Sequence, residues 1–186
     1  MRVVAGKYGS RPLKAVPGNN TRPTTDKIKE SLFSMLGGFF DGGTVLDLYG
    51  GTGGLAIEAI SRGMDKAYIC EQYRPALKII AENIVMTKEP ERFIVLAGNN
   101  RQQLAQLGDV IFDLVLIDPP YKKQMIEQDV EWLAQHRLIS EDTIILCETD
   151  DETQLPDTLL NWYKIKFKTY GNTHIHVYQY DETLNA

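Results

Sequence analysis

Four consecutive residues, Asp118-Pro119-Pro120-Tyr121, have the groups needed to hold a planar aromatic amine. The Asp118 carboxylate and the Pro119 carbonyl can both accept hydrogen bonds from one exocyclic amine. Because proline has no N–H and a fixed φ, nothing local competes for these acceptors and the turn is rigid. Tyr121 offers a flat face for an unstacked base, a contact worth about 1–3 kcal/mol in single-strand binders. The simpler alternative is a strand followed by an Asp-Pro turn with a packed tyrosine.

The segment before this motif predicts how it is positioned. Residues 112–117 read Phe-Asp-Leu-Val-Leu-Ile, which is typical of a buried parallel strand. Open α/β sheets bind their ligands at the carboxyl ends of such strands. We therefore expect Asp118, Pro119, Pro120 and Tyr121 to form the catalytic part of a ligand site.

A glycine loop predicts a second part of this site. In residues 45–56 a strand leads into Gly51-x-Gly53-x-x-Ala56, which matches the loose dinucleotide fingerprint. Glu71 lies twenty residues after Gly51, where an acid can bind ribose hydroxyls. This pattern suits NAD nearly as well as S-adenosylmethionine. Asp47 discriminates between them, because a carboxylate before the loop repels a pyrophosphate and favours an ammonium or sulfonium.

The rest of the chain alternates between strand and helix patterns. This alternation predicts a mostly parallel sheet wound on both faces, with a closing hairpin that adds an antiparallel edge strand. The expected strands cover residues 45–49, 67–71, 93–97, 112–118, 143–148, 162–170 and 174–180. The expected helices cover residues 55–62, 74–88, 102–107 and 123–135.

The N-terminal segment is basic, although the chain as a whole is acidic. Residues 1–40 contain seven Lys or Arg against two acids, a local charge of +5, whereas the whole chain carries −5. Strand patterns at residues 2–4 and 13–16 predict a β-hairpin that projects Lys7, Arg11 and Lys14. A basic arm on an acidic body is expected where one end contacts phosphates. A merely solvated arm is the alternative.

Residues 21–26, Thr-Arg-Pro-Thr-Thr-Asp, predict the start of a helix that ends at residues 37 and 38. Thr24 or Thr25 can cap this helix, and Asp26 suits the positive end of its dipole. The hydroxyls and Arg22 could also bind an anion there. Arg22 and Thr25 are therefore cofactor-binding candidates, and Arg22 is an RNA-binding candidate as well.

Composition indicates a globular protein without a membrane-spanning helix or a signal peptide. The 186 residues are 43% hydrophobic and 24% charged, as expected of one globular domain with a small appendage. The sequence contains neither a run of about 18 apolar residues nor the apolar core of a signal peptide. Cys70 and Cys147 lie in expected buried strands, which indicates reduced core cysteines in a cytoplasmic protein with no membrane partner. The three histidines form no ligand pattern, so no metal is expected.

These motifs together resemble the RsmD family of bacterial 16S ribosomal RNA guanine-N2 methyltransferases. The resemblance covers residues 1 to about 180. It rests on the motifs at residues 21–26 and 118–121, and on Asp-Leu-Tyr-Gly-Gly-Thr-Gly at 47–53, Ser-Arg-Gly at 61–63 and Tyr-Gly-Asn-Thr at 170–173.

This resemblance implies a class I S-adenosylmethionine-dependent methyltransferase fold, a Rossmann-like seven-stranded sheet of order 3-2-1-4-5-7-6. It implies a methyltransferase domain at residues 21–186 and an N-terminal extension at residues 1–20 that engages 16S rRNA. It also implies that S-adenosylmethionine binds at the loop of Asp47, Tyr49, Gly51 and Gly53 and at Glu71, leaving S-adenosylhomocysteine as product. The substrate is then 16S rRNA within a 30S subunit or an assembly intermediate.

Two positions depart from the family pattern. Ala56 stands where the family usually has a third glycine, a change expected only to tighten helix packing. Gly98-Asn99-Asn100 stands where an acid usually ends the third strand. Asn99 or Asn100 is then the expected partner of the adenine amine, through a side-chain oxygen.

Three alternatives stay open on the sequence. A DNA adenine-N6 or cytosine-N4 methyltransferase uses the same Asp-Pro-Pro-Tyr motif, although this chain has no obvious target-recognition domain. A non-catalytic RNA-binding assembly factor could retain the fold without turnover. An NAD-dependent oxidoreductase would leave residues 118–121 without a role.

Overall fold

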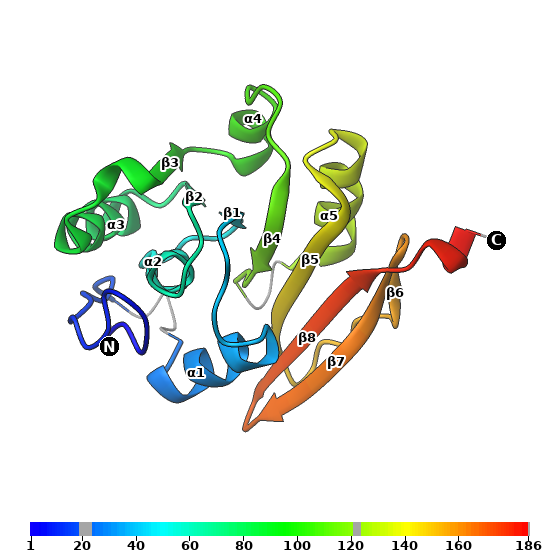
Figure 1. Cartoon of the computed structure of the whole chain (residues 1–186), viewed down its shortest axis with the longest axis horizontal. Helices are drawn as coiled ribbons and strands as arrows, with labels where there is room; N and C mark the ends of the chain where they lie inside the picture. Colours follow the sequence, from blue (N-terminus) through cyan, green and yellow to red (C-terminus); the bar gives the residue numbers. More distant parts are fainter. Residues whose placement is uncertain (19–23, 121–123, 186) are drawn as a thin grey trace.

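A single twisted sheet forms the centre of the computed structural model, which describes residues 1–18, 24–120 and 124–185 (Figure 1). Its order among the described residues is β3-β2-β1-β4-β5-β8-β7-β6. The strands are β1 (Thr44–Asp47), β2 (Lys66–Glu71), β3 (Phe93–Ala97), β4 (Phe112–Ile117), β5 (Ile139–Asp150), β6 (Thr158–Leu159), β7 (Trp162–Tyr170) and β8 (Thr173–Tyr180). The first five run parallel, and β8 and β7 add antiparallel strands beyond β5.

This order confirms the predicted 3-2-1-4-5-7-6 sheet, in which predicted strand 7 corresponds to β8 and predicted strand 6 corresponds to β7. The two-residue β6 was not predicted, because Thr158 and Leu159 are too few to give a periodic pattern. Strand β5 is longer than expected, and it includes a register shift opposite β4 between Phe112 and Leu114. The closing hairpin was predicted correctly.

Helices cover both faces of the sheet. They are α1 (Asp26–Met35), α2 (Gly54–Ser61), α3 (Arg74–Thr87), α4 (Asn100–Leu104) and α5 (Ile126–Gln135), with short 3-10 turns at η1 (Pro90–Arg92) and η3 (Glu182–Asn185). One apolar core lies between the sheet and α1, α2 and α3, and a second lies between the sheet and α4 and α5. Among the described residues, no helix is long and apolar enough to cross a membrane.

Helix α1 begins and ends as predicted. The Thr25 hydroxyl accepts a hydrogen bond from the Ile28 N–H at 3.2 Å, and Asp26 occupies the first turn. At the other end the Gly38 N–H donates to the Phe33 carbonyl at 2.9 Å. The glycines after Leu36 adopt positive φ, which few other residues tolerate. Helix α5, by contrast, begins at Ile126 and not at residue 123 as expected.

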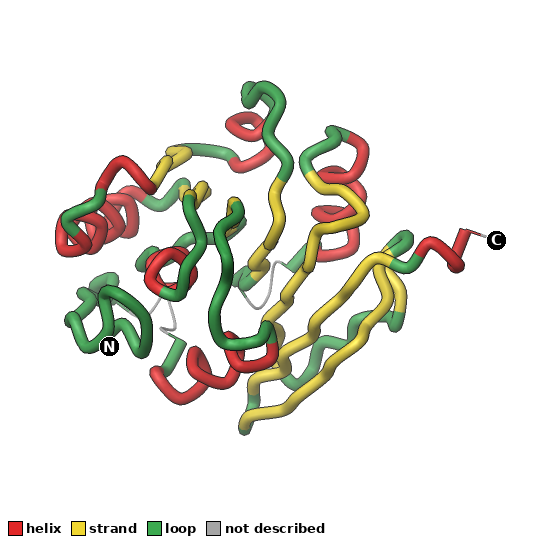
Figure 2. Tube along the Cα trace, in the orientation of Figure 1, coloured by secondary structure: helices red, strands yellow, loops and turns green. Residues whose placement is uncertain are grey.

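The predicted N-terminal β-hairpin is wrong in detail. Residues 1–18 form a loop that contains one antiparallel bridge, between Arg2 and Pro12, and no regular strand (Figure 2). Backbone hydrogen bonds join Val3 to Ser10 and Arg11, and Met1 to Leu13, but the pairing extends no further because helix side chains bind the backbone groups of the residues that follow Val3. The Val4 and Ala5 N–H groups donate to the Glu58 carboxylate at 2.8 and 3.0 Å. This segment also packs Val3, Tyr8 and Leu13 into the α1–α2 core.

The segment approaches α2 closely at Gly6. Its φ is +84°, and a Cβ on this residue would lie 1.9 Å from the Ser61 carbonyl oxygen. The neighbouring Lys7 N–H donates to that same carbonyl at 2.9 Å. Only glycine therefore fits at this contact between the N-terminal segment and α2.

Candidate active site

Strand β1 and the glycine loop after it form one wall of the candidate site. The loop follows Asp47 and ends at Gly53, the residue that caps α2, with φ +79°. Gly50 packs closely against β2, so that a Cβ on this residue would lie only 2.5 Å from the Ile69 Cγ2 atom. A Cβ on Gly51, at φ +58°, would meet nothing within 4 Å. The backbone at Gly51 is therefore open to a ligand at the carboxyl edge of the sheet.

Asp47 has an unusual environment at this edge. It is 1% exposed, and the Tyr49 and Ala56 backbone amides near its carboxylate do not reach hydrogen-bond geometry, so neither oxygen has a partner among the described residues. Burial, together with the charge of Glu71, raises the pKa of Asp47 to about 8, and the Tyr49 and Ala56 backbone amides offset only part of this. A buried carboxyl group without a partner is costly unless a bound ligand supplies one. The methionine ammonium and the sulfonium of S-adenosylmethionine fit this requirement.

Glu71 ends the adjacent strand β2 between two loops. The Gly50 N–H donates to the Cys70 carbonyl at 2.8 Å, and the Gly98 N–H donates to the Glu71 carbonyl at 2.9 Å. The backbone at the end of β2 thus joins the β1 loop to the β3 loop, and the Gly51 amide lies near the Glu71 carboxyl, which is the position where an acid can bind ribose hydroxyls. Burial raises the pKa of this carboxyl, although the Gln72 and Gly51 backbone amides oppose the shift.

The two asparagines after β3 have distinct local contacts. The Asn99 side-chain oxygen caps α4 by accepting from the Gln102 N–H at 3.1 Å. A second lone pair on that oxygen is the one that an adenine amine would use. Asn100 is the first residue of α4 and interacts with the Tyr49 hydroxyl. The adenine contact therefore stays a prediction for both residues.

Tyr49 is held by a buried acid that sequence reasoning missed. Its hydroxyl donates to Asp129 of α5 at 2.7 Å, and Arg101 reaches the other Asp129 oxygen at 3.3 Å. Burial is the main cause that raises the pKa of both Tyr49 and Asp129. A signal for Asp129 was present, since it lies on the apolar stripe of α5, between Ile126 and Leu133.

The predicted amine-binding motif, residues 118–121, follows β4, which lies next to β1 in the sheet. The register pairs Asp47 with Leu116, two residues before Asp118. Asp118 is half-buried, Pro119 is buried and Pro120 is exposed. Tyr121, the predicted stacking residue, lies outside the described residues, so its role stays a prediction. The structure thus places the predicted cofactor carboxylate and the predicted amine acceptors on neighbouring strand ends.

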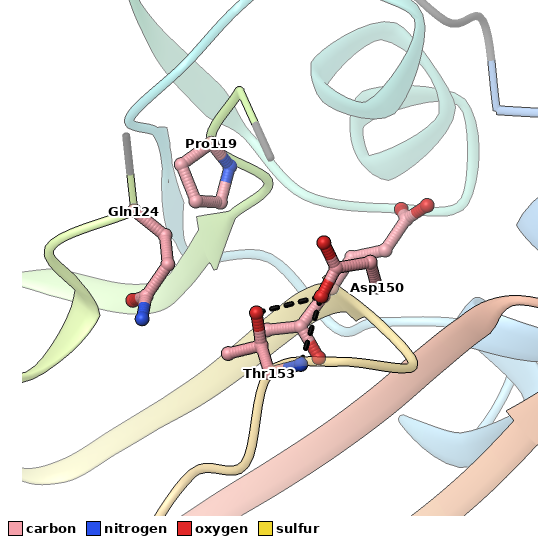
Figure 3. A pocket seen from close by; sticks show the side chains of 6 residues that line it. Pro119, Gln124, Asp150 and Thr153 are labelled. Atoms are coloured by element: carbon pink, nitrogen blue, oxygen red, sulfur yellow. Dashed lines mark hydrogen bonds between the residues drawn. The ribbon is translucent and has the colours of Figure 1, made fainter. Parts of the chain in front are cut away.

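A small pocket opens beside Pro119 (Figure 3). The Thr153 N–H and hydroxyl both donate to Asp150 at its rim, at 2.8 and 2.6 Å. Its lining residues are Pro119, Gln124, Glu148, Thr149, Asp150 and Thr153. The buried Glu148, also missed by sequence reasoning, accepts from the Thr24 hydroxyl at 3.5 Å. Thr24 therefore connects the segment before α1 to the pocket beside Pro119.

The remaining candidates fall into two groups. Arg22 lies outside the described residues, and the Thr25 hydroxyl is engaged in capping, so both cofactor roles stay predictions. The arm cations contact α3 and the turn after it. Lys7 pairs with Glu89 at 3.0 Å and Lys14 pairs with Glu82 at 3.1 Å. Arg11 donates to the carbonyls of Met86 and Thr87 at 3.3 and 3.2 Å.

Comparison with known proteins assigns the chain to a family. The family model described as conserved hypothetical protein 95 matches residues 1–179. YlbH of Bacillus subtilis is 36% identical over 181 residues, covering 96% of this chain and 98% of YlbH. Ribosomal RNA small subunit methyltransferase D of Escherichia coli K12 is 28% identical over 179 residues, covering 96% and 89%. The chain belongs to the RsmD family.

Solved structures agree with this RsmD-family assignment. The yhhF protein of Escherichia coli superposes with a TM-score of 0.81 at 26% identity, covering 97% of this chain and 98% of yhhF. A conserved hypothetical protein of Streptococcus pyogenes gives 0.79 at 42% identity, covering 82% and 95%. A ribosomal protein L11 methylase of Lactobacillus delbrueckii gives 0.61 at 19% identity, covering 83% and 80%. The fold is that of a class I methyltransferase.

Proposed function

We propose that this RsmD-family chain methylates the exocyclic N2 amine of a guanine in 16S rRNA, presented in a 30S subunit or an assembly intermediate. S-adenosylmethionine supplies the methyl group in this reaction and leaves as S-adenosylhomocysteine, and no metal takes part. The observation that carries the proposal is the unpartnered, buried Asp47 on the strand next to Asp118. The relative named ribosomal RNA small subunit methyltransferase D supports the RNA substrate. Such a substrate places the protein in the cytoplasm.

The amine needs activation because its lone pair is delocalised into the guanine ring. Asp118 and the Pro119 carbonyl accept both N–H bonds of the amine, which favours a pyramidal nitrogen and stabilises the positive charge that develops on attack. Tyr121 stacks the base, which must leave any helix to enter the site. Holding the nitrogen in line with the methyl donor supplies most of the acceleration. The proton is then lost to Asp118 or to water.

Three groups position the cofactor in this proposal. Asp47 attracts its cationic portion, and Glu71 accepts hydrogen bonds from the ribose hydroxyls. The open backbone at Gly51 allows the close approach. Tyr49, fixed by Asp129, sets the shape of the wall between the glycine loop and α5.

The N-terminal extension, residues 1–20, contacts rRNA in this proposal, and residues 21–186 form the methyltransferase domain. Lys7 and Lys14 are paired in partly exposed salt bridges, each of which is worth at most about 1 kcal/mol. Phosphates can therefore replace Glu89 and Glu82 as partners at little cost.

Methyl transfer from labelled S-adenosylmethionine tests the proposal. The acceptors are unmodified 30S subunits, free 16S rRNA and duplex DNA, with product nucleosides identified by mass and Asp118→Ala as control. N2-methylguanosine in either ribosomal acceptor, absent with the variant, is the expected result. N6-methyladenine or N4-methylcytosine in DNA would refute the rRNA substrate but would keep methyl transfer to an exocyclic amine. No transfer to any acceptor, with RNA binding retained, would point to an assembly factor.

A further inference from the structure

The outer edge of the sheet carries a basic strand that the proposed site does not use. Strand β7 and β8 form a hairpin at one side of the molecule (Figure 1), where residues 165–169 of β7 are all exposed. From residue 158 to residue 180 the sequence contains three lysines and no acid, although the whole chain carries −5. The positive charge of this hairpin is therefore local and strong.

These lysines differ from those of the N-terminal segment in their partners. Lys7 and Lys14 are neutralised by glutamates. Among the described residues, neither Lys166 nor Lys168 has an acidic partner. Lys166 donates one hydrogen bond to the Met35 carbonyl at 2.8 Å, which leaves its other N–H groups available. The ammonium of Lys168 lies 5.2 Å from the centre of the Tyr170 ring.

Helix α1 extends this basic surface toward the active site. Tyr170 contacts Ser31 of α1 through their hydroxyls. Lys27 is exposed and lies one turn before Ser31, on the same side of the helix. Lys27, Lys166 and Lys168 thus surround the junction of α1 and β7, with Tyr170 between them. We call these three lysines the α1–β7 lysine row.

One end of the lysine row, at Lys168 and Tyr170, lies beside the carboxyl end of β5. The register pairs Tyr170 with Thr173, and Thr173 in turn with Asp150, which lines the pocket beside Pro119. Two strand spacings separate β7 from β5, so the end of β7 lies about 10 Å from the end of β5. A nucleotide whose base enters the pocket would therefore have flanking phosphates within reach of the row.

Starting from the proposed function, we propose that the α1–β7 lysine row binds rRNA phosphates next to the target nucleotide. A row of three lysines, none of which forms a salt bridge among the described residues, is complementary to a polyanion. A second copy of this chain is a less favourable partner, because a two-fold symmetric contact would place the lysine row of one copy against the lysine row of the other, and the like charges would repel. Lysines also protect free strand edges from pairing, but that role needs no RNA contact.

The charge-removing variant Lys166→Gln/Lys168→Gln tests the row, with an in vitro 16S rRNA transcript as the probe. Affinity is measured between 50 and 300 mM salt. We expect roughly tenfold weaker binding at 150 mM salt and a log–log salt slope smaller by about 2, since each lost phosphate contact removes roughly one from the slope. The matched control is Lys66→Gln/Arg137→Gln, which removes two charges at the amino ends of β2 and β5, away from the row, and should change neither quantity.

A second variant distinguishes a loss of RNA contacts from a loss of folding. Lys27→Gln/Lys168→Gln leaves the Lys166 hydrogen bond to Met35 intact, and it should show the same loss. Melting temperature and S-adenosylmethionine affinity should match the wild type for both variants. A salt slope equal to that of the control would overturn the assignment. So would a wild-type dimer that dissociates on Lys166→Gln/Lys168→Gln, because the row would then be an interface between copies.

The binding measurement separates this inference from the proposed function, because it needs no turnover. If RNA binding depends on these lysines but no guanine is methylated, the proposed function would be refuted and the RNA-binding role of the row would be supported. If the chain methylates guanine but both variants bind RNA with the affinity and salt slope of the wild type, only the RNA-binding role of the lysine row would be refuted.

Discussion

Asp47 and Glu71 lie at the carboxyl ends of adjacent parallel strands, and the charge of Glu71 adds to burial in raising the pKa of Asp47 to about 8. A carboxyl group in this state is protonated in the folded chain and ionised in the unfolded chain between about pH 4 and pH 8. It therefore destabilises the ligand-free fold increasingly as pH rises through this window.

The variant Asp47→Asn should remove this penalty. We expect its free energy of unfolding to exceed the wild-type value by a few kcal/mol at pH 7.5, since each pKa unit corresponds to about 1.4 kcal/mol. The difference should disappear near pH 4. Denaturant unfolding across this pH range measures it, and a difference that does not grow with pH would refute the assignment. The same variant should bind S-adenosylmethionine at least tenfold more weakly, as calorimetry would show, because the ammonium and sulfonium lose their carboxylate.

Asp118→Asn should separate binding from chemistry. The amide keeps the size of the side chain but loses the charge that stabilises the developing cation, so we expect kcat to fall by about 10²–10³. S-adenosylmethionine affinity should stay within twofold of wild type. Single-turnover methyl transfer and calorimetry measure the two quantities. Unchanged kcat would remove Asp118 from the mechanism.

Glu58 is the buried carboxylate that joins the N-terminal segment to α1 and α2. It pairs with Arg62 at 2.8 Å and with the buried Lys29 at 3.4 Å, in addition to its bonds from Val4 and Ala5. Glu58→Gln should cost about 3–5 kcal/mol of unfolding free energy, because it leaves buried cations without their partner. Urea unfolding measures this loss, and limited proteolysis should show faster cleavage within residues 1–18.

The exposed pair formed by Glu82 and Lys14 provides the matched control. Glu82→Gln removes the same charge from a surface pair and should cost less than about 1 kcal/mol. Equal losses for Glu58→Gln and Glu82→Gln would contradict the central role of Glu58.

His176 makes the fold sensitive to acid. It is 1% exposed, faces Phe167, His174 and Thr149, and bonds the Thr149 hydroxyl at 3.0 Å. Burial, with smaller contributions from Lys164 and His174, lowers the pKa of His176 to about 4. The unfolded chain therefore binds one more proton than the folded chain between about pH 6.5 and pH 4, and stability falls as pH decreases through this range. His176→Asn should reduce that pH dependence by about one proton, as unfolding curves at several pH values would show.

The sequence predicted most of the architecture because local patterns determine it. The apolar run before Asp118, the Thr25 cap and the glycines after Leu36 each specify an element without reference to distant residues. The alternating strand and helix units predicted a mostly parallel sheet with an antiparallel edge, and the family resemblance implied the strand order. The placement of Asp47 and Asp118 on neighbouring strand ends is a consequence of that order.

What the sequence did not predict depends on contacts between distant segments. The predicted N-terminal hairpin is reduced to one bridge because side chains of α2 and α3 accept hydrogen bonds from the N–H groups of Val4, Ala5, Tyr8 and Lys14, and no local pattern predicts these contacts. The pairing of Lys7 and Lys14 with acids about seventy to eighty residues away was missed for the same reason. Asp129 could have been found from its core-facing position on α5, but its partner Tyr49 could not.

The attachment of the N-terminal segment also sets an order of events during synthesis. Val4 bonds Glu58, 54 residues later, and Lys14 bonds Asn83, 69 residues later. Residues 1–18 are therefore synthesised before the helices that hold them. Until α3 has been translated, the cationic side chains of this segment lack their partners on α3 while they are close to the RNA of the ribosome that makes them.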